Sequence, residues 1–125
     1  MNGFSFYYKF AILLLATFFI GSCASLPKGG YEKGEASWYG RYFHGRTTAN
    51  GEKYNMNAMT AAHPSLKFGT RVKVVNTQNG RAVVVRINDR GPYANGRIID
   101  VSKAAARKLG MISSGVASVL IYIID

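Results

Sequence analysis

Cysteine and acidic residues are scarce in this 125-residue sequence, which has one cysteine and six Asp and Glu residues in total. A single cysteine excludes an internal disulfide, and with only two histidines no metal cluster stands out. Prolines number three and 48% of the residues are apolar, a composition that excludes general disorder. The length fits one small domain with a modest core.

The few acidic residues stand against 16 Lys and Arg residues, which gives a formal net charge of +10. Such a basic chain attracts polyanions, and nucleic acid would be the default partner inside the cytoplasm. For an exported protein the abundant anions are lipid headgroups, phosphorylated envelope polymers and the carboxylates of peptidoglycan. Alternatively, the charge gives only solubility and loose surface binding, because exposed charges are screened over about 10 Å.

The longest apolar run covers residues 10–20, which is the length of a signal-peptide core and short for a membrane span. The sequence IGSC then leads into Cys23 and resembles the lipobox cleaved by the lipoprotein signal peptidase. We therefore expect a signal peptide over residues 1–22, lipidation of Cys23 and a tether over residues 23–33. An uncleaved signal anchor is the alternative. Ala24 resembles the outer-membrane sorting pattern of Gram-negative bacteria, which would place the protein facing the periplasm.

Strand patterns dominate the rest of the chain. Residues 71–75 and 81–87 are joined through a segment that ends in Asn79-Gly80, which predicts a β-hairpin. Further short strands are predicted over residues 35–39, 59–62, 97–101 and 117–123.

One helix is predicted over residues 103–109, where good helix formers lie between a capping Ser102 and the terminating Gly110. Six short strands cannot hide both faces of a sheet in so small a domain unless the sheet closes on itself. We therefore predict an all-β fold, a small barrel over residues 34–125. An immunoglobulin-like sandwich is the alternative, although it would need seven strands.

Asp89 is the first candidate for chemistry. It follows Val83, Val85 and Ile87, which share one face of a strand by the period-two rule. If that face lines the core, Asp89 emerges at the rim as a partly desolvated carboxyl, which is a candidate general acid. Alternatively, Asp89 binds turn amides or pairs with a nearby arginine such as Arg90.

Four other residues could join Asp89. Glu52 and His63 lie at loop or strand edges, but the sequence gives no distance between them, and a lone histidine is more often structural. Trp38 and Tyr39 offer flat faces on which sugar rings pack well. The alternative is that Trp38 anchors the core while Tyr39 points outward.

Six motifs follow one another in order: GEASWYG (34–40), FHGR (43–46), TANGE (48–52), TAAHP (60–64), NDRGP (88–92) and RIIDVS (97–102). Together with the lipobox they resemble the rare lipoprotein A family over nearly all of the chain after the predicted tether. The resemblance implies a double-psi β-barrel of six strands with one short helix, the fold of plant expansins and of several enzymes that cleave cell-wall glycans.

The resemblance also implies lytic transglycosylase activity on peptidoglycan. In that reaction an acid protonates the glycosidic oxygen between N-acetylmuramic acid and N-acetylglucosamine, and the C6 hydroxyl of the muramic acid then attacks C1 to give a 1,6-anhydro sugar. One carboxyl group can serve as acid and then as base. The predicted catalytic residues are Asp89, Glu52 and His63, and the predicted substrate-binding residues are Trp38, Tyr39, Thr60 and Arg90.

Members of this family often prefer glycan that has lost its stem peptides, and many carry a septal peptidoglycan-binding domain, which we do not find in these 125 residues. We expect no cofactor, no metal and no nucleic-acid partner, and we expect a monomer. The competing hypothesis is an expansin-like lipoprotein that binds and loosens peptidoglycan without cleaving it. A third hypothesis is a basic envelope protein that binds nucleic acid or anionic lipid.

Overall fold

Alternating residues build the hairpin that the sequence predicts, and the computed structural model, which describes residues 30–125, confirms it. β3 (Arg71–Asn76) pairs antiparallel with β4 (Ala82–Asp89), and buried residues alternate with more exposed ones along both strands. Gly80, in the connecting turn, has a φ of +77°, which glycine adopts without steric cost. The alternation therefore sets which face of the hairpin packs into the core.

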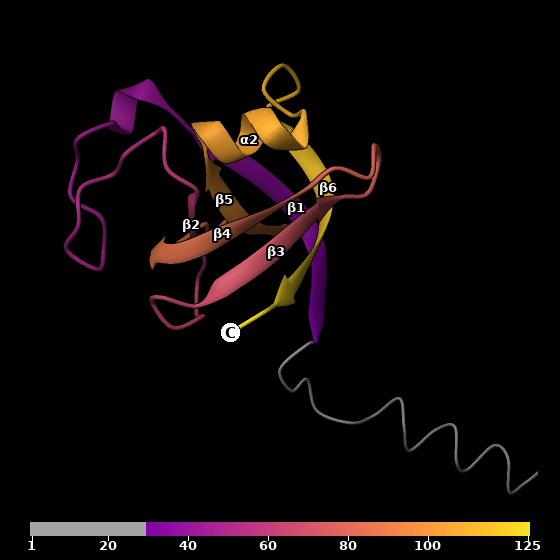
Figure 1. Cartoon of the computed structure of the whole chain (residues 1–125), viewed down its shortest axis with the longest axis horizontal. Coiled ribbons are helices and arrows are strands. Elements are labelled where there is room, and N and C mark those ends of the chain that lie inside the picture. The colour runs from indigo at the N-terminus through magenta and orange to yellow at the C-terminus, as the bar shows by residue number, and fades with distance from the viewer. Residues whose placement is uncertain (1–29) are drawn as a thin grey trace, which may run out of the picture.

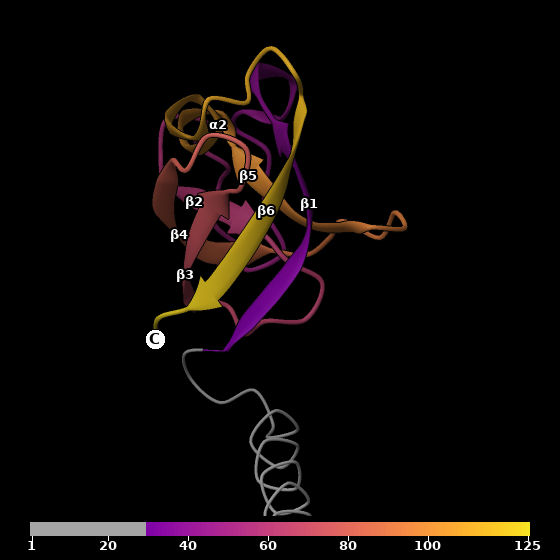
Figure 2. The same cartoon turned by 90° about the vertical axis from the view of Figure 1, so that its right-hand side faces the viewer.

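Six strands close into a barrel in the order β1-β5-β2-β4-β3-β6 (Figures 1 and 2). The remaining four are β1 (Tyr31–Tyr39), β2 (Thr60–Ala62), β5 (Arg97–Ser102) and β6 (Val116–Ile123). β1 pairs with β5, and β2 with β4, in parallel, whereas the other neighbours are antiparallel. The predicted all-β barrel of six strands is confirmed, and the sandwich alternative is wrong.

β1 begins at Tyr31, three residues before the predicted start of the domain at Gly34. Its first part pairs with residues 119–122 of β6. Glu32 and Lys33 are exposed there, so no buried apolar residue marks this end of the strand in the sequence. The predicted signal peptide and the lipidation site lie outside the described residues.

The single helix predicted from the sequence, α2 (Lys103–Leu109), lies across one end of the barrel (Figure 1). Ser102 caps it by accepting a hydrogen bond from the Ala105 N–H at 3.2 Å, and Gly110 ends it with a φ of +71°. Leu109 is fully buried against the strands, a burial that stabilises the fold by about 1.5–3 kcal/mol. In the part of the chain that the structure describes, no helix is long and apolar enough to cross a membrane.

Residues 40–59 connect β1 to β2 and lie to one side of the barrel (Figure 1). This segment starts with the short 3-10 helix η1 (Arg41–Phe43). Tyr54 fixes it to the barrel: its ring is 2% exposed, and its hydroxyl donates to the Tyr39 carbonyl and accepts from the Lys103 N–H. The segment is therefore held against β1 and α2, where it forms one wall of the groove described next.

Candidate functional site

Four neighbouring strands contribute one residue each to a single row. Asp89 of β4 lies opposite Ala62 of β2, and Ala62 lies opposite Asp100 of β5. Asp100 in turn lies opposite Ser37 of β1. Neighbouring strands are about 4.8 Å apart, so the backbones that carry the two carboxyl groups are separated by about 10 Å. Only the methyl group of Ala62 stands between them in this row.

Both carboxyl groups line one groove of about 650 Å³, which lies within the usual size range of ligand sites. The groove brings together acidic, basic and aromatic side chains from most of the chain. The charged and aromatic residues in its lining are Asp89, Asp100, Arg46, Arg90, Arg97, Trp38, Tyr39, Phe43 and Tyr54. Flat rings beside charged groups suit a ligand that is polar at its edges and apolar on its faces.

A shift in strand register brings Asp89 to the groove. Ala61 lies opposite Ile87, but the next residue of β2, Ala62, lies opposite Asp89, so β4 has one extra residue at Asn88. Such a bulge redirects the side chain that follows it. Strict alternation would instead put Asp89 on the face of Ile87, which is fully buried.

The carboxyl group of Asp89 is held on one side and open on the other. Its Oδ1 accepts hydrogen bonds from the backbone N–H groups of Ala49 and Arg90, both at 2.9 Å. No residue within 30–125 donates a hydrogen bond to its Oδ2. The two N–H donors therefore fix the orientation of the group and leave one oxygen for a ligand.

Asp100 is the second carboxyl group in the groove, and it is not among the residues predicted from the sequence. Burial is the main influence on its pKa and raises it; the hydrogen bond from the Ser37 hydroxyl and the charge of Arg97 oppose this, and the charge of Asp89 adds to it. A carboxyl group whose neutral form is favoured is suited to donate a proton. The signal available in the sequence was an acidic residue between two apolar residues of a predicted strand, Ile99 and Val101.

Tyr39 also lines the groove, as predicted for a substrate-binding residue. Its hydroxyl oxygen is buried and has no hydrogen-bond partner among the described residues. Burial raises the pKa of this phenol, and the charges of Asp89, Tyr54 and Asp100 raise it further. The phenol is therefore neutral, and its hydrogen-bonding capacity is unused among the described residues.

Trp38 combines the two roles that the sequence left open, since it lines the groove and also packs against the core. Gly40 makes room for its ring, because a Cβ at this position would lie 2.7 Å from the ring atom Cζ3.

Thr60 does not reach the groove: it is only 3% exposed and its hydroxyl has no partner among the described residues. It is the first residue of β2, the strand that also carries Ala62.

Arg90 lines the groove, but its guanidinium group turns toward the loop that follows β2. It donates hydrogen bonds to the carbonyls of His63 and Leu66, at 3.2 and 2.7 Å, and lies 4.0 Å from the centre of the Phe68 ring. These contacts tie this loop to the residue that follows Asp89.

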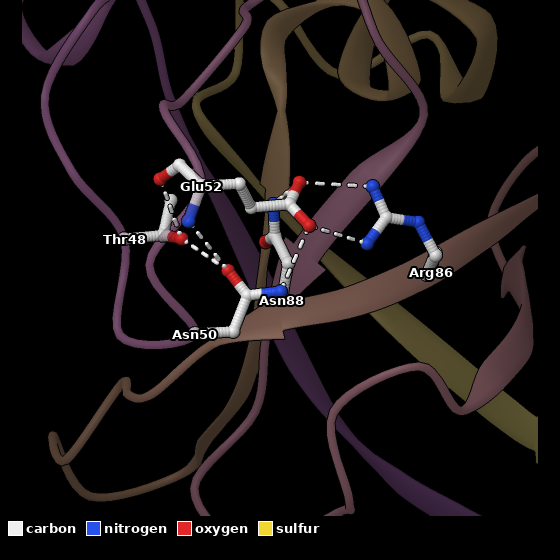
Figure 3. A network of polar contacts seen from close by, with 5 residues as sticks. All are labelled: Thr48, Asn50, Glu52, Arg86 and Asn88. Atoms are coloured by element: carbon white, nitrogen blue, oxygen red, sulfur yellow. Dashed lines mark hydrogen bonds and ion pairs between the residues drawn. The ribbon is translucent and has the colours of Figure 1, made fainter.

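Glu52 lies outside the groove, at the centre of a polar network (Figure 3). Its carboxylate accepts two hydrogen bonds from Arg86, at 2.8 and 2.9 Å, and one each from Asn50 and Asn88. The hydrogen bond from Arg86 is the main cause that lowers the pKa of Glu52 to about 2. The group is therefore ionised at neutral pH with both oxygens occupied, which suits a structural role better than proton transfer.

The network holds the loop that contacts Asp89. The Thr48 N–H donates to the Glu52 carbonyl at 2.7 Å, which closes a tight turn between them. Within the turn, the Ala49 N–H donates to Asp89 and the Asn50 N–H donates to the Asn88 carbonyl. Glu52 thus influences Asp89 through this loop rather than by direct contact.

His63 lines a second pocket of about 340 Å³, whose other lining residues include Tyr31 and Glu32 of β1 and Ile121 and Ile123 of β6. Its Nδ1 accepts hydrogen bonds from the backbone N–H groups of Ser65 and Leu66, both at 3.1 Å. The proton therefore belongs on Nε2, which lies 3.0 Å from Glu32 and donates to it. Only the backbone N–H of His63 reaches Asp89, donating to its carbonyl at 3.1 Å.

The three predicted catalytic residues thus occupy three neighbouring places rather than one: Asp89 in the groove, Glu52 beside it and His63 behind it. Over residues 30–125, no group of three or more His, Cys, Asp or Glu side chains could hold a metal ion.

Comparison with known sequences agrees with the motifs. A family model described as lytic transglycolase matches residues 31–121. The chain is 64% identical over 92 residues to a probable endolytic peptidoglycan transglycosylase RlpA of Synechocystis, and 57% identical over 98 residues to an endolytic peptidoglycan transglycosylase RlpA of Vibrio cholerae. These alignments cover 74% and 78% of this chain but only 29% and 37% of the two relatives.

Solved structures share the barrel at low sequence identity. A Streptomyces papain inhibitor has a TM-score of 0.65 at 23% identity, over 81% of this chain and all of the inhibitor. An expansin of Clavibacter michiganensis has a TM-score of 0.60 at 23% identity, over 76% of this chain and 50% of the expansin. Together with the family match, these similarities confirm the double-psi class of the barrel.

Proposed function

Because the chain belongs to the lytic transglycolase family, we propose that it cleaves the bond between N-acetylmuramic acid and N-acetylglucosamine in peptidoglycan and leaves 1,6-anhydro ends. The observation that carries this proposal is the pair of carboxyl groups, Asp89 and Asp100, on either side of Ala62 in one groove. The relatives with this activity in their names are 53–65% identical to the chain, although the chain spans well under half of each.

The two carboxyl groups have different environments, which suits them to different steps. Asp100, whose pKa is raised chiefly by burial, would protonate the glycosidic oxygen. Asp89, with an open Oδ2, would accept the proton of the C6 hydroxyl as that oxygen attacks C1. The bond from C1 to the bridging oxygen breaks, the bond from C1 to O6 forms, and one proton passes in each direction. This division differs from the sequence hypothesis, in which Asp89 performs both transfers.

Neighbouring side chains would hold the sugar during these steps. The free hydroxyl of Tyr39 would donate a hydrogen bond to a ring substituent, and the Trp38 ring would pack against the apolar face of a sugar. We extend the proposal to glycan that has lost its stem peptides, because such strands present less bulk to a groove of about 650 Å³.

Mass spectrometry of digestion products tests the proposal. The full chain, kept in mild detergent, is incubated with sacculi and with stem-free glycan strands, and soluble products with anhydro ends are expected. Asp89→Asn should abolish them. Glycan that pellets with the protein without any soluble product, unchanged by Asp89→Asn, would instead identify an expansin-like binding module.

Activity on peptidoglycan would place the protein in the cell envelope. We further propose a signal peptide over residues 1–22, a lipid on Cys23, a tether that ends before β1 begins at Tyr31 rather than at residue 33, and an outer-membrane location facing the periplasm. The support is the IGSC motif and the single cysteine. Intact mass after expression in a Gram-negative host should show an acylated protein that begins at Cys23. Cys23→Ser should leave a soluble or uncleaved form, and an unmodified wild-type chain would refute lipidation.

A further inference from the structure

Aromatic rings form a continuous series from the core to the outer edge of the groove. The buried ring of Tyr54 stacks on Tyr39 with 4.4 Å between ring centres, and Tyr39 contacts the edge of Phe43 at 5.8 Å. Phe43 in turn meets Tyr42 edge to face at 5.3 Å. Phe43 is 40% exposed and Tyr42 is 76% exposed, so both rings keep surface that a ligand can contact.

Arg46 lies over these outer rings. The central carbon of its guanidinium group is 4.9 Å from the centre of the Tyr42 ring and 5.6 Å from that of Phe43. The backbone is fixed on both sides, since the Arg46 N–H donates to the Phe43 carbonyl and the Arg46 carbonyl accepts from Tyr54. Both Phe43 and Arg46 line the groove that holds the two carboxyl groups.

The charge of Arg46 has no partner in the described part of the chain. Arg71, Arg86 and Arg97 pair with acidic side chains, and Arg90 donates to backbone carbonyls. No ion pair or hydrogen bond occupies the guanidinium group of Arg46 within residues 30–125. Contact with ring faces leaves the N–H groups at the edge of the guanidinium plane available, and their fork matches a carboxylate.

We propose that Arg46, with Tyr42 and Phe43, forms a subsite of the groove that binds a carboxylate carried by the glycan. This rests on the proposed function, because peptidoglycan is the polymer that would bring such a group. The rings would contact the apolar face of a sugar while the guanidinium pairs with the anion. The carboxylate is either the lactyl group of a muramic acid without its stem or a group on a stem peptide.

Three forms of one glycan preparation separate these sources: stem-free strands with free lactyl carboxylates, the same strands with the lactyl groups converted to methyl amides, and strands that keep their stems. For the full chain, KM and kcat are measured from the release of anhydro ends. Arg46→Gln should raise KM about tenfold on the free lactyl strands if that group is bound, and on the stem-bearing strands if a stem carboxylate is bound. The amidated strands should show less than a twofold change.

Arg41→Gln is the matched control, because it removes the same charge from the same segment at a residue that does not line the groove. It should change KM less than twofold on all three substrates. Tyr42→Ala, which removes one supporting ring but keeps the charge, should raise KM about threefold. The proposal would be overturned if Arg46→Gln changed KM equally on charged and amidated strands. It would also be overturned if Arg41→Gln and Arg46→Gln changed KM by the same factor.

Failure of the proposed function would look different. If no form of the glycan yields anhydro ends with the wild-type chain, the subsite is tested by equilibrium binding of the same three strands. Weaker binding of the amidated strands by the wild type, lost in Arg46→Gln, would support the subsite alone. Equal binding of all three strands would reject it.

Discussion

The two acidic regions on this side of the barrel differ in how fully their oxygens are used. In the Glu52 network every carboxylate oxygen has a partner, and the group is locked in its ionised form. In the groove, Asp89 keeps one oxygen open and burial favours the neutral form of Asp100. A satisfied acid holds a loop, whereas an acid with spare capacity can act on a ligand. We therefore propose the groove as the place for chemistry and the network as its support.

The largest effect should come from the groove acids. We expect Asp89→Asn and Asp100→Asn each to lower kcat for release of anhydro ends by about 10²–10⁴-fold, because each removes one proton transfer. Stopped assays with mass spectrometry measure the loss. If Asp100→Asn keeps near-normal kcat while Asp89→Asn is inactive, one carboxyl group performs both transfers and the division proposed above is wrong.

A smaller effect is expected in the network. Glu52→Gln keeps the shape but weakens the pairing with Arg86, and should reduce the free energy of unfolding at pH 7 by about 1 kcal/mol after allowance for partial exposure. A folded-state pKa of about 2 lies below the ordinary Glu value, so this stability is present above about pH 4 and is lost as the pH falls toward 2. Thermal unfolding at a series of pH values should show the stabilities of wild type and Glu52→Gln converging as the pH approaches 2.

The activity of Glu52→Gln shows whether Glu52 only holds the loop or acts on the substrate itself. Because Ala49 should lose part of its fixed position, Glu52→Gln should lower kcat by about tenfold. A loss as large as that of Asp89→Asn, in a variant that remains folded at the assay temperature, would show that Glu52 itself acts on the substrate.

The His63 pair of variants tests the region behind the groove. His63→Asn offers an oxygen near the position of Nδ1 and can keep the hydrogen bonds from Ser65 and Leu66, so kcat should fall less than about threefold. His63→Gln loses that acceptor for the part-buried N–H groups of Ser65 and Leu66, which should lower the free energy of unfolding by about 1 kcal/mol. Urea unfolding and kcat are compared for both. Full activity of His63→Gln together with no activity of His63→Asn would instead show that activity depends on His63 Nε2 and its contact with Glu32.

The smallest expected effect is that of Asp100→Asn on stability, which should rise although the activity of this variant should fall. The pKa of Asp100 is raised in the folded state, so ionisation costs stability as the pH rises from the ordinary Asp value through the raised one. Asp100→Asn can still accept the Ser37 hydrogen bond and removes this cost, so it should be more stable than wild type by less than about 1 kcal/mol at pH 7. Below the ordinary Asp pKa the gain should vanish in thermal unfolding. A destabilised variant at pH 7 would contradict the assignment.

Local patterns in the sequence predicted most of the fold. Alternating valines predicted the hairpin, and Ser102 and Gly110 predicted both ends of the helix. The start of β1 could not be read, because Glu32 and Lys33 are exposed and only the pairing with β6 defines that part of the strand.

The site depends on contacts that join distant parts of the chain. Ser37 reaches Asp100 across 63 positions, and Glu52 reaches Arg86 across 34, so spacing along the sequence could not reveal either pair. Asp89 was selected because it ends an apolar strand, but the bulge that turns it toward the groove leaves no mark in the alternation. The predicted meeting of three catalytic side chains came from the motifs, which give no information on where the ring of His63 points.

The parallel pairings of β1 with β5 and of β2 with β4 have a consequence for how the groove comes into being. Its two acids lie on strands that are not neighbours and become aligned only when β2 is inserted between them. A nascent chain therefore has no complete groove before β5 is made, and opening of the sheet at β2, whose three residues are all buried, would separate the acids and expose the hydrophobic interior together. Alignment of the two acids, and with it the proposed activity, is in this sense an all-or-none property of sheet closure.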